Sequence, residues 1–191
     1  MNSLYQFIIK PIGERYDNKI KVDNKELIIN SSISDHKFIN RIAAVVSIPL
    51  GFVVHHNLFR RYYDMKGKSV NGSKFFKDDL YFAEDTQIYL YKNKDTWKTN
   101  LDFCFVTPLV EEDDSKGVKL KKNVGILKYD NSTLETLDIA PGDVVGFKPN
   151  REFQFTIDKE ILYCMQSNDI TIKYEYQGNE TKYNPSWSKS S

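Results

Sequence analysis

The feature that most constrains the fold of this 191-residue chain is a series of short apolar runs without helical spacing. No stretch of about 12 residues keeps apolar side chains at positions i, i+3, i+4 and i+7. The runs are rich in Val, Ile, Tyr and Phe, and they are separated by Gly, Pro, Asn and Asp. They predict β-strands over residues 4–10, 41–48, 52–56, 80–82, 87–92, 101–106, 124–129, 143–147, 152–157, 161–165 and 170–176. Many short strands with frequent turns predict an all-β sandwich or barrel.

Two halves of the sequence share three short matches in the same order. The longest places residues 77–91 over residues 159–173 without a gap, and in it Leu80, Tyr81 and Ile88 coincide with Leu162, Tyr163 and Ile170. Upstream, Gly51–Val54 lies over Gly142–Val145, and Ile8–Ile12 lies over Phe105–Leu109.

Because the three matches keep their order, we interpret the chain as a tandem repeat. The predicted domains are residues 1–95 and 96–178. A polar tail, 179–191, follows and is expected to be disordered.

Composition excludes some classes of function. Twenty-seven basic residues face 26 acidic ones, and this net charge of +1 does not favour a chain that binds polyanions over its whole surface. No apolar stretch is long enough to span a bilayer, so a membrane is not expected as a partner. Cys104 and Cys164 lie in apolar runs, which predicts two buried free thiols and a reducing, cytoplasmic compartment.

The second half carries the more specific family signal. Its segments 140–147, 159–165 and 168–170 read Ala-Pro-Gly-Asp-Val-Val-Gly-Phe, Lys-Glu-Ile-Leu-Tyr-Cys-Met and Asn-Asp-Ile. They resemble the C-terminal part of the GroES-type co-chaperonin barrel. In the first half, Phe7–Glu14 looks like the opening strand of that family, and Glu26–Ile29 looks like the apolar tripeptide of its mobile loop. The resemblance covers about half of the chain.

This resemblance implies two tandem GroES-like β-barrels with a mobile loop in the first. It implies a co-chaperonin-like cap that binds the ring of an ATP-driven, GroEL-type chaperonin and assists protein folding. It further implies a homo-oligomer without cofactor, metal or catalysis, working in the host cytoplasm if a bacteriophage encodes it. Two departures are Phe52, where the family has Asp, and the second half's loop region, 110–123, which lacks an apolar triplet.

The candidate docking loop covers residues 17–38. It is polar and without periodicity, and Leu27, Ile28 and Ile29 lie in its middle. Long structureless loops in compact domains are usually functional, so these three residues are the predicted chaperonin-binding site. The alternative is that residues 22–29 form an ordinary strand with Leu27 and Ile29 on the core face.

The insertion over residues 57–74 mixes basic and aromatic side chains and includes Arg60, Arg61, Tyr62 and Tyr63 as a possible accessory binding site. This composition suits single-stranded nucleic acid. The favoured alternative is a hairpin whose aromatic residues pack on the barrel, so nucleic acid is not expected as a partner.

Enzyme motifs are absent from the sequence, which has no phosphate loop, nucleophile elbow or dinucleotide fingerprint. Adjacent His55 and His56 would point to opposite faces of a strand, which does not favour a metal site. A second hypothesis for function remains open: a β-barrel binding or structural protein, viral or nucleic-acid-associated, without capping activity.

Overall fold

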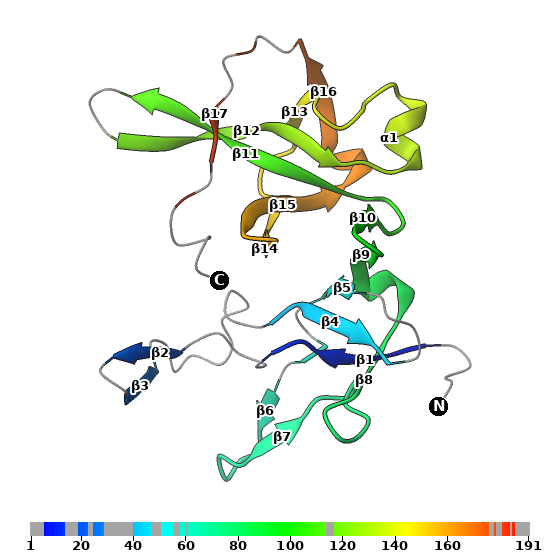
Figure 1. Cartoon of the computed structure of the whole chain (residues 1–191), viewed down its shortest axis with the longest axis vertical. Coiled ribbons are helices and arrows are strands. Elements are labelled where there is room, and N and C mark those ends of the chain that lie inside the picture. The colour runs from blue at the N-terminus through cyan, green and yellow to red at the C-terminus, as the bar shows by residue number, and fades with distance from the viewer. Residues whose placement is uncertain are drawn as a thin grey trace. The chain divides into compact units, whose positions relative to one another are not determined.

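The computed structural model describes residues 6–13, 19–22, 25–28, 40–46, 51–55, 58–59, 61–113, 117–175, 178, 181–183 and 185 (Figure 1). The chain divides into two compact units, Met1–Thr96 and Trp97–Ser191. Among the described residues, helical structure is limited to α1 (Ser132–Thr136) and two 3₁₀ turns, η2 (Asp85–Gln87) and η3 (Ser167–Asp169). The all-β prediction is therefore confirmed.

Unit 1 is built on a six-stranded sheet with the order β10-β9-β5-β4-β1-β8. Two further hairpins of unit 1, β2–β3 and β6–β7, are separate two-stranded sheets. The described strands within unit 1 are β1 (Phe7–Pro11), β2 (Lys19–Val22), β3 (Lys25–Ile28), β4 (Ile42–Val45), β5 (Gly51–Val54), β6 (Arg61–Tyr63), β7 (Ser69–Asn71), β8 (Tyr81–Ala83) and β9 (Ile88–Asn93). The last strand of this sheet, β10 (Thr96–Thr99), begins at the final residue of unit 1 and continues into unit 2.

Unit 2 holds a seven-stranded sheet in which β14-β15-β11-β12-β13-β16 follow one another and β17 pairs with β11. Its strands are β11 (Phe103–Asp113), β12 (Gly117–Tyr129), β13 (Val144–Phe147), β14 (Phe153–Ile157), β15 (Glu160–Gln166), β16 (Ile170–Tyr174) and β17 (Thr181–Lys182). Because β17 lies within residues 179–191, the expectation of a wholly disordered tail is wrong for Thr181 and Lys182.

Five strands follow the same order in both units. The order β8-β1-β4-β5-β9 of unit 1 corresponds to β15-β11-β12-β13-β16 of unit 2. Every paired residue of these five strands in unit 1 has a paired counterpart in unit 2. For example, Ile9 lies opposite Val45 and Tyr81, and its counterpart Val106 lies opposite Leu127 and Tyr163. The internal repeat thus extends to the register of the sheet.

The register corrects one match made from the sequence. Val54 pairs with Ile88, and Phe147 pairs with Ile170, so Val54 corresponds to Phe147. Gly51 then corresponds to Val144, two residues beyond the Gly142 that the sequence places over it. A shift of two residues keeps every side chain on the same face of a strand, so the apolar pattern alone could not detect it.

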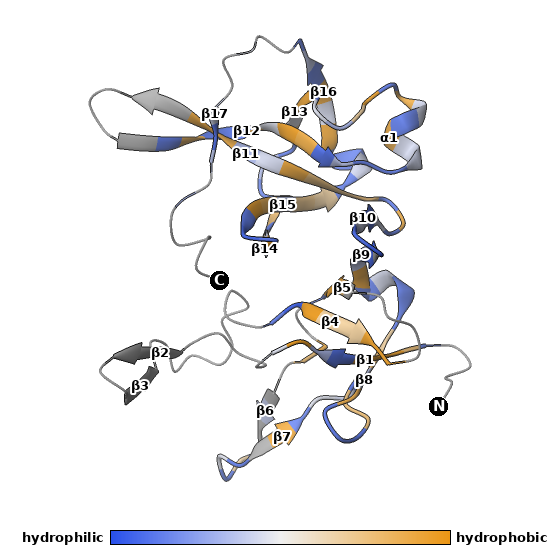
Figure 2. Cartoon of the chain, viewed as in Figure 1, coloured by the Kyte–Doolittle hydropathy of each residue, from blue (hydrophilic) through white to orange (hydrophobic). Residues whose placement is uncertain are grey.

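Neither sheet closes into a barrel through the pairings of its described strands. The edge strands are β10 and β8 in the six-stranded sheet, and β14 and β16 in the seven-stranded sheet. Figure 2 shows the contrast between a central and an edge strand of the six-stranded sheet: β4 is coloured largely hydrophobic and β10 largely hydrophilic.

Each unit has its own apolar core. The core of unit 1 gathers residues from the sheet and from the insertion, among them Ile9, Phe52, Leu58, Phe59, Tyr81 and Ile88. The core of unit 2 includes Cys104, Val106, Leu127, Leu134, Phe147 and Met165.

Both cysteines are free and buried, as predicted. Cys104 lies opposite Met165, and Cys164 lies opposite Phe105. Directly opposed residues share a face and neighbours in a strand do not, so the two thiols lie on opposite faces of the sheet. This geometry does not allow a disulfide between them.

Candidate functional site

Two insertions distinguish unit 1 from the shared five-strand pattern. One lies between β1 and β4 and contains the hairpin β2–β3, which we call the N-terminal hairpin. The other lies between β5 and β8 and contains the hairpin β6–β7, which we call the basic hairpin (residues 61–71). At the corresponding places unit 2 has the extended arm of β11 and β12 and the short connection 148–152 between β13 and β14. Functional residues are often carried by such connections on a fixed scaffold.

The N-terminal hairpin contains two of the three predicted docking residues. In its register Ile20 lies opposite Leu27, and Lys19 lies opposite Ile28. Ile29 lies outside the described residues. The expectation of a structureless loop over residues 17–38 is wrong for the residues that pair. The hairpin is favoured by a cross-strand pair of large apolar residue types and by the high β-propensity of Ile20 and Val22 in β2 and of Ile28 in β3.

The alternative interpretation, an ordinary strand over residues 22–29, agrees with the structure for residues 25–28, which form β3. β3 pairs with β2, and the two form a sheet of their own. Ile28 is therefore carried by a hairpin that leaves unit 1 between β1 and β4, and not by the six-stranded sheet.

The base of the second insertion is part of the core. Leu58 and Phe59 are buried, and the rings of Phe59 and Phe75 both meet the Tyr81 ring edge-on, with centroids 4.9 and 5.6 Å apart. Aromatic packing on the core of unit 1 is thus observed for Phe59 of the insertion and for Phe75, which follows the insertion directly. It does not extend along the whole hairpin.

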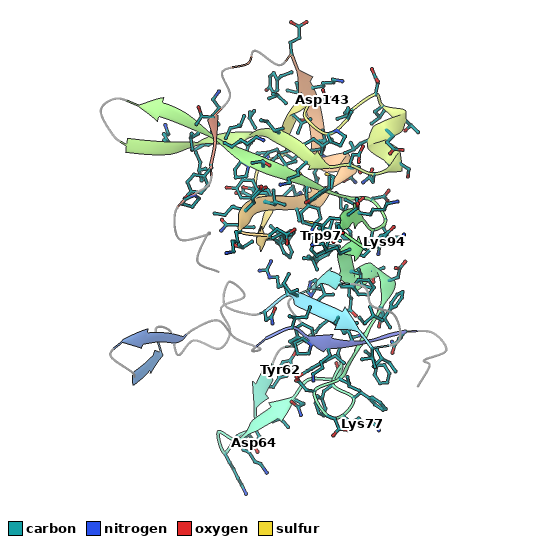
Figure 3. The ribbon with its side chains drawn as sticks, in the orientation of Figure 1. Tyr62, Asp64, Lys77, Lys94, Trp97 and Asp143 are labelled. Atoms are coloured by element: carbon teal, nitrogen blue, oxygen red, sulfur yellow. The ribbon has the colours of Figure 1, made fainter. Side chains whose placement is uncertain are left out.

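The accessory residues are distributed along this second insertion. Arg60 lies outside the described residues, and Arg61, Tyr62 and Tyr63 form β6. Tyr62 lies directly opposite Val70, and both are 47% exposed. Figure 3 marks Tyr62 and Asp64 at this hairpin.

The turn of the basic hairpin is fixed by one carboxylate. Asp64 Oδ1 accepts hydrogen bonds from the backbone N–H groups of Lys66 and Lys68, each at 2.9 Å. The backbone adds bonds from Asp64 N to Lys68 O and from Gly67 N to Asp64 O. Gly67 has a φ of +75°, a conformation that costs glycine little. The turn therefore presents Met65, Lys66 and Lys68 to solvent on an ordered backbone.

His55 marks the point where β5 leaves the sheet toward this insertion. Burial, and to a smaller extent the Arg41 guanidinium, lower the pKa of His55 from its usual 6.5. The imidazole is therefore neutral at pH 7 and adds no positive charge to the insertion. Its backbone N–H bonds Gln87 O at 2.8 Å, as that of Lys148 bonds Asp169 O in unit 2 at 2.9 Å.

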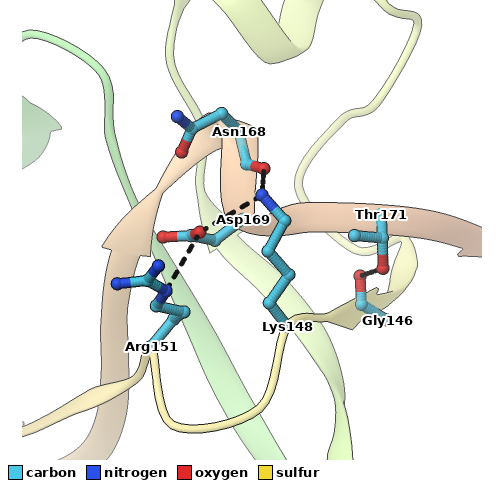
Figure 4. Close-up of polar contacts among 6 residues, drawn as sticks. All are labelled: Gly146, Lys148, Arg151, Asn168, Asp169 and Thr171. Atoms are coloured by element: carbon cyan, nitrogen blue, oxygen red, sulfur yellow. Dashed lines mark hydrogen bonds and ion pairs between the residues drawn. The ribbon is translucent and has the colours of Figure 1, made fainter.

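Unit 2 holds a charged cluster at this equivalent place (Figure 4). Asp169 Oδ1 lies 3.6 Å from Lys148 Nζ and 3.8 Å from Arg151 Nε, and Lys148 Nζ also donates to Asn168 O at 2.7 Å. The two exposed cations thus surround one nearly buried carboxylate and tie η3 to the end of β13. We interpret this cluster as structural, because each charge is used within the unit.

Sequence reasoning missed a buried polar link that organises unit 2. Asn131 caps α1 by accepting from Leu134 N, and its Nδ2 donates to Phe103 O at 2.8 Å. The side chains of Asn131 and Ser167 also bond each other, and Ser167 Oγ donates to Asp102 O. An Asn before a short helix was the available signal, but its partners come from distant strands.

Comparison with known proteins gives no assignment: no family model, curated protein or solved structure matches the chain. No helix among the described residues is long and apolar enough to cross a membrane. Within the same residues, no group of three His, Cys, Asp or Glu side chains is arranged to hold a metal ion.

Proposed function

We propose that this chain is a co-chaperonin-like cap that binds the ring of an ATP-driven, GroEL-type chaperonin and assists protein folding. The observation that carries the proposal is the N-terminal hairpin. It is a sheet of its own, and it carries Leu27 and Ile28 at the place where the family resemblance puts the docking loop. The repeated five-strand unit supports the proposal, with each unit taken as a divergent GroES-like barrel.

Docking would use the apolar residues Leu27, Ile28 and Ile29. Full burial of one such side chain contributes about 1.5–3 kcal/mol, so three contribute roughly 5–9 kcal/mol before costs. Ordering a segment on binding takes back several kcal/mol of this. One hairpin therefore binds weakly and reversibly, and a ring of copies restores affinity through avidity.

The remaining parts of the proposal follow from this role. The chain forms a homo-oligomer, works in the cytoplasm, and in the case of a bacteriophage protein works with the host chaperonin. It binds no nucleotide and catalyses no reaction. Its work is to cover the apolar rim of the chaperonin and enclose the substrate.

The deciding experiment is a pull-down of a purified GroEL-type chaperonin, with and without ATP, by the wild-type chain and by Ile28→Asp. We expect Ile28→Asp to lose binding while its thermal midpoint stays close to that of the wild type, because the hairpin is separate from the six-stranded sheet. Ile28→Leu keeps an apolar side chain and should still bind. Leu137→Asp places the same charge at an exposed apolar residue of unit 2 and should also bind.

Retained binding by a folded Ile28→Asp variant would overturn the docking site. Absence of binding by the wild type under both nucleotide conditions would overturn the cap itself. The chain would then be better described as a β-rich binding or structural protein without capping activity.

A further inference from the structure

The basic hairpin is the described surface that the proposed capping role leaves without a use. It is an addition to the repeated unit, because unit 2 joins β13 to β14 at the same position through residues 148–152 alone. Its base is anchored by Leu58 and Phe59, which are 1% and 0% exposed. From residue 64 to residue 68 its backbone runs through solvent-exposed positions. We propose that this hairpin binds single-stranded nucleic acid.

Charge is the first argument. Residues 61–71 contain three Lys or Arg and one Asp, a net of +2, whereas the whole chain carries +1. The excess is therefore local. The one acidic residue, Asp64, is held in the turn by two backbone N–H groups, which leaves the ammonium groups of Lys66 and Lys68 on the outside. Lysines on an exposed, ordered turn suit the spaced charges of a phosphate backbone.

The apolar part of the hairpin is the second argument. Tyr62 is half exposed and lies across from Val70, and Met65 at the tip is exposed over its whole surface. An aromatic ring beside cations is the arrangement on which unpaired bases stack, and this contact is tolerant of sequence because every base has a flat face. Tyr62 would stack a base while Lys66 and Lys68 hold adjacent phosphates.

The shape of the hairpin favours a single strand over a folded protein partner. Protein interfaces deplete lysine at their centres, and here Lys66 and Lys68 both follow closely on the tip residue Met65. A fixed turn also binds without the entropy cost of ordering it first. The order of the turn comes from the Asp64 carboxylate and from backbone groups, so the lysine side chains remain available for contact.

The test is fluorescence anisotropy of a labelled single strand of about 20 nucleotides, at about 50 and about 200 mM salt, with the matching duplex in parallel. The wild type should bind the single strand more tightly than the duplex, and binding should weaken with salt. For single strands, the slope of log K against log salt concentration has a magnitude of about 0.7 per phosphate contact. The double change Lys66→Ala with Lys68→Ala should therefore reduce this magnitude by about 1.4. Tyr62→Ala should weaken binding about tenfold, and Tyr62→Phe should not.

Lys119→Ala with Lys122→Ala is the matched control, since it removes two exposed lysines from β12 and should leave the salt slope unchanged. All variants should keep the wild-type thermal midpoint. Ile28→Asp should bind the single strand as the wild type does, which separates this inference from the chaperonin contact. The proposal would be overturned if the wild type did not bind the single strand at low salt. It would also be overturned if the β12 control lost as much of the salt slope as the Lys66 and Lys68 variant. Equal affinity for the duplex and the single strand would remove the stacking role of Tyr62.

Discussion

Gly125 lies so close to Val106 on the neighbouring strand that a Cβ atom on it would come within 2.4 Å of Val106 Cγ1. The same Cβ would lie 2.6 Å from the carbonyl oxygen of Thr107. Gly125 pairs with Pro108, and the corresponding pair in unit 1 is Ala43 with Pro11. The two units thus share this strand pairing, but they differ in the space beside it: unit 1 accommodates the Cβ of Ala43, whereas unit 2 has no room for a Cβ at Gly125.

Gly125→Ala should lower the free energy of unfolding of unit 2 by about 1–3 kcal/mol, because the new methyl group meets backbone that cannot move aside. Urea denaturation followed by the fluorescence of Trp97 measures this. Gly146→Ala is the control: its Cβ would meet side-chain atoms of Tyr174 and Ile172 at 3.0 Å or more, and Tyr174 is 42% exposed. A larger loss for Gly146→Ala than for Gly125→Ala would contradict this account.

Asn131→Ala should destabilise unit 2 by about 2–3 kcal/mol, since it removes a helix cap and leaves the Phe103 carbonyl group and Ser167 without this partner. In Asn131→Ser the hydroxyl oxygen can still cap the helix, but the shorter side chain does not reach Phe103. The loss of stability of unit 2 should therefore be intermediate. Thermal and urea unfolding compare the three proteins. Equal stability of Asn131→Ala and the wild type would show that the buried link contributes nothing.

Cys104 and Cys164 should resist thiol reagents in the folded protein. Both are buried, and burial, with a smaller effect of the Asp169 charge, raises the pKa of Cys104 to about 12. The reactive thiolate of Cys104 is therefore scarce at neutral pH. Labelling followed by mass spectrometry should show slow modification in buffer and rapid modification of both residues in denaturant. Fast labelling of the native protein would place this part of the core in contact with solvent.

Asp143 should make the stability of unit 2 depend on pH at the acid end. A hydrogen bond from Ala140 N–H, and then one from Lys173, lower the pKa of Asp143 from its ordinary 3.8. The stabilisation that the Asp143 carboxylate adds to the free energy of unfolding is present above pH 3.8, and it is lost as the pH falls through the folded-state pKa. The hydrogen bond to Asp143 raises the pKa of Lys173, so its contribution is present below its ordinary 10.5 and is lost as pH rises through the folded-state value.

Asp143→Asn should accordingly be less stable than the wild type at pH 7, and the two proteins should converge as the wild-type carboxylate becomes protonated. Urea titrations across the acid range measure the difference. A difference that grows toward low pH would have the wrong sign for this carboxylate. Figure 3 marks Asp143 in unit 2.

Strand periodicity made most of the central sheets predictable. The gap-free match of Leu80 and Ile88 with Leu162 and Ile170 coincides with a strand, a 3₁₀ turn and a strand in both units. Alternating apolar residues and turn formers encode this arrangement locally. The match of Gly51 with Gly142 was wrong by two residues because identical residue types do not define a strand register. The register follows from pairing with the neighbouring strand, as of Val54 with Ile88.

Strands that contain charged residues were the main elements that the sequence pattern did not predict. The expectation of a loop region over residues 110–123 is wrong for the described residues: β11 continues to Asp113, β12 begins at Gly117, and Glu111 lies opposite Lys119. The pairing of two strands depends on both of them, so the pattern of one segment does not report it. β17 is two residues long and is too short to carry a pattern at all.

The location of the candidate sites in the chain was predictable from the sequence, but the structure that each site adopts was not. An apolar triplet in a polar stretch located the N-terminal hairpin, but the pairing of Ile20 with Leu27 needed the structure. In the second insertion, composition alone did not separate the aromatic residues that pack, such as Phe59, from Tyr62, which remains half exposed. That division depends on which residues reach the Tyr81 ring.

The strand order has a consequence for synthesis. The first strand of each unit lies inside its sheet, between strands that are made later: β1 pairs with β4 and β8, and β11 pairs with β12 and β15. On a ribosome, Ile9 therefore emerges long before its partner Tyr81. Pairings of such long sequence separation form slowly, and an unpaired apolar strand is open to a neighbouring nascent chain in the meantime. We expect the yield of folded protein to fall when nascent chains are crowded, because β1 and β11 then meet neighbouring chains before their own later partners are synthesised.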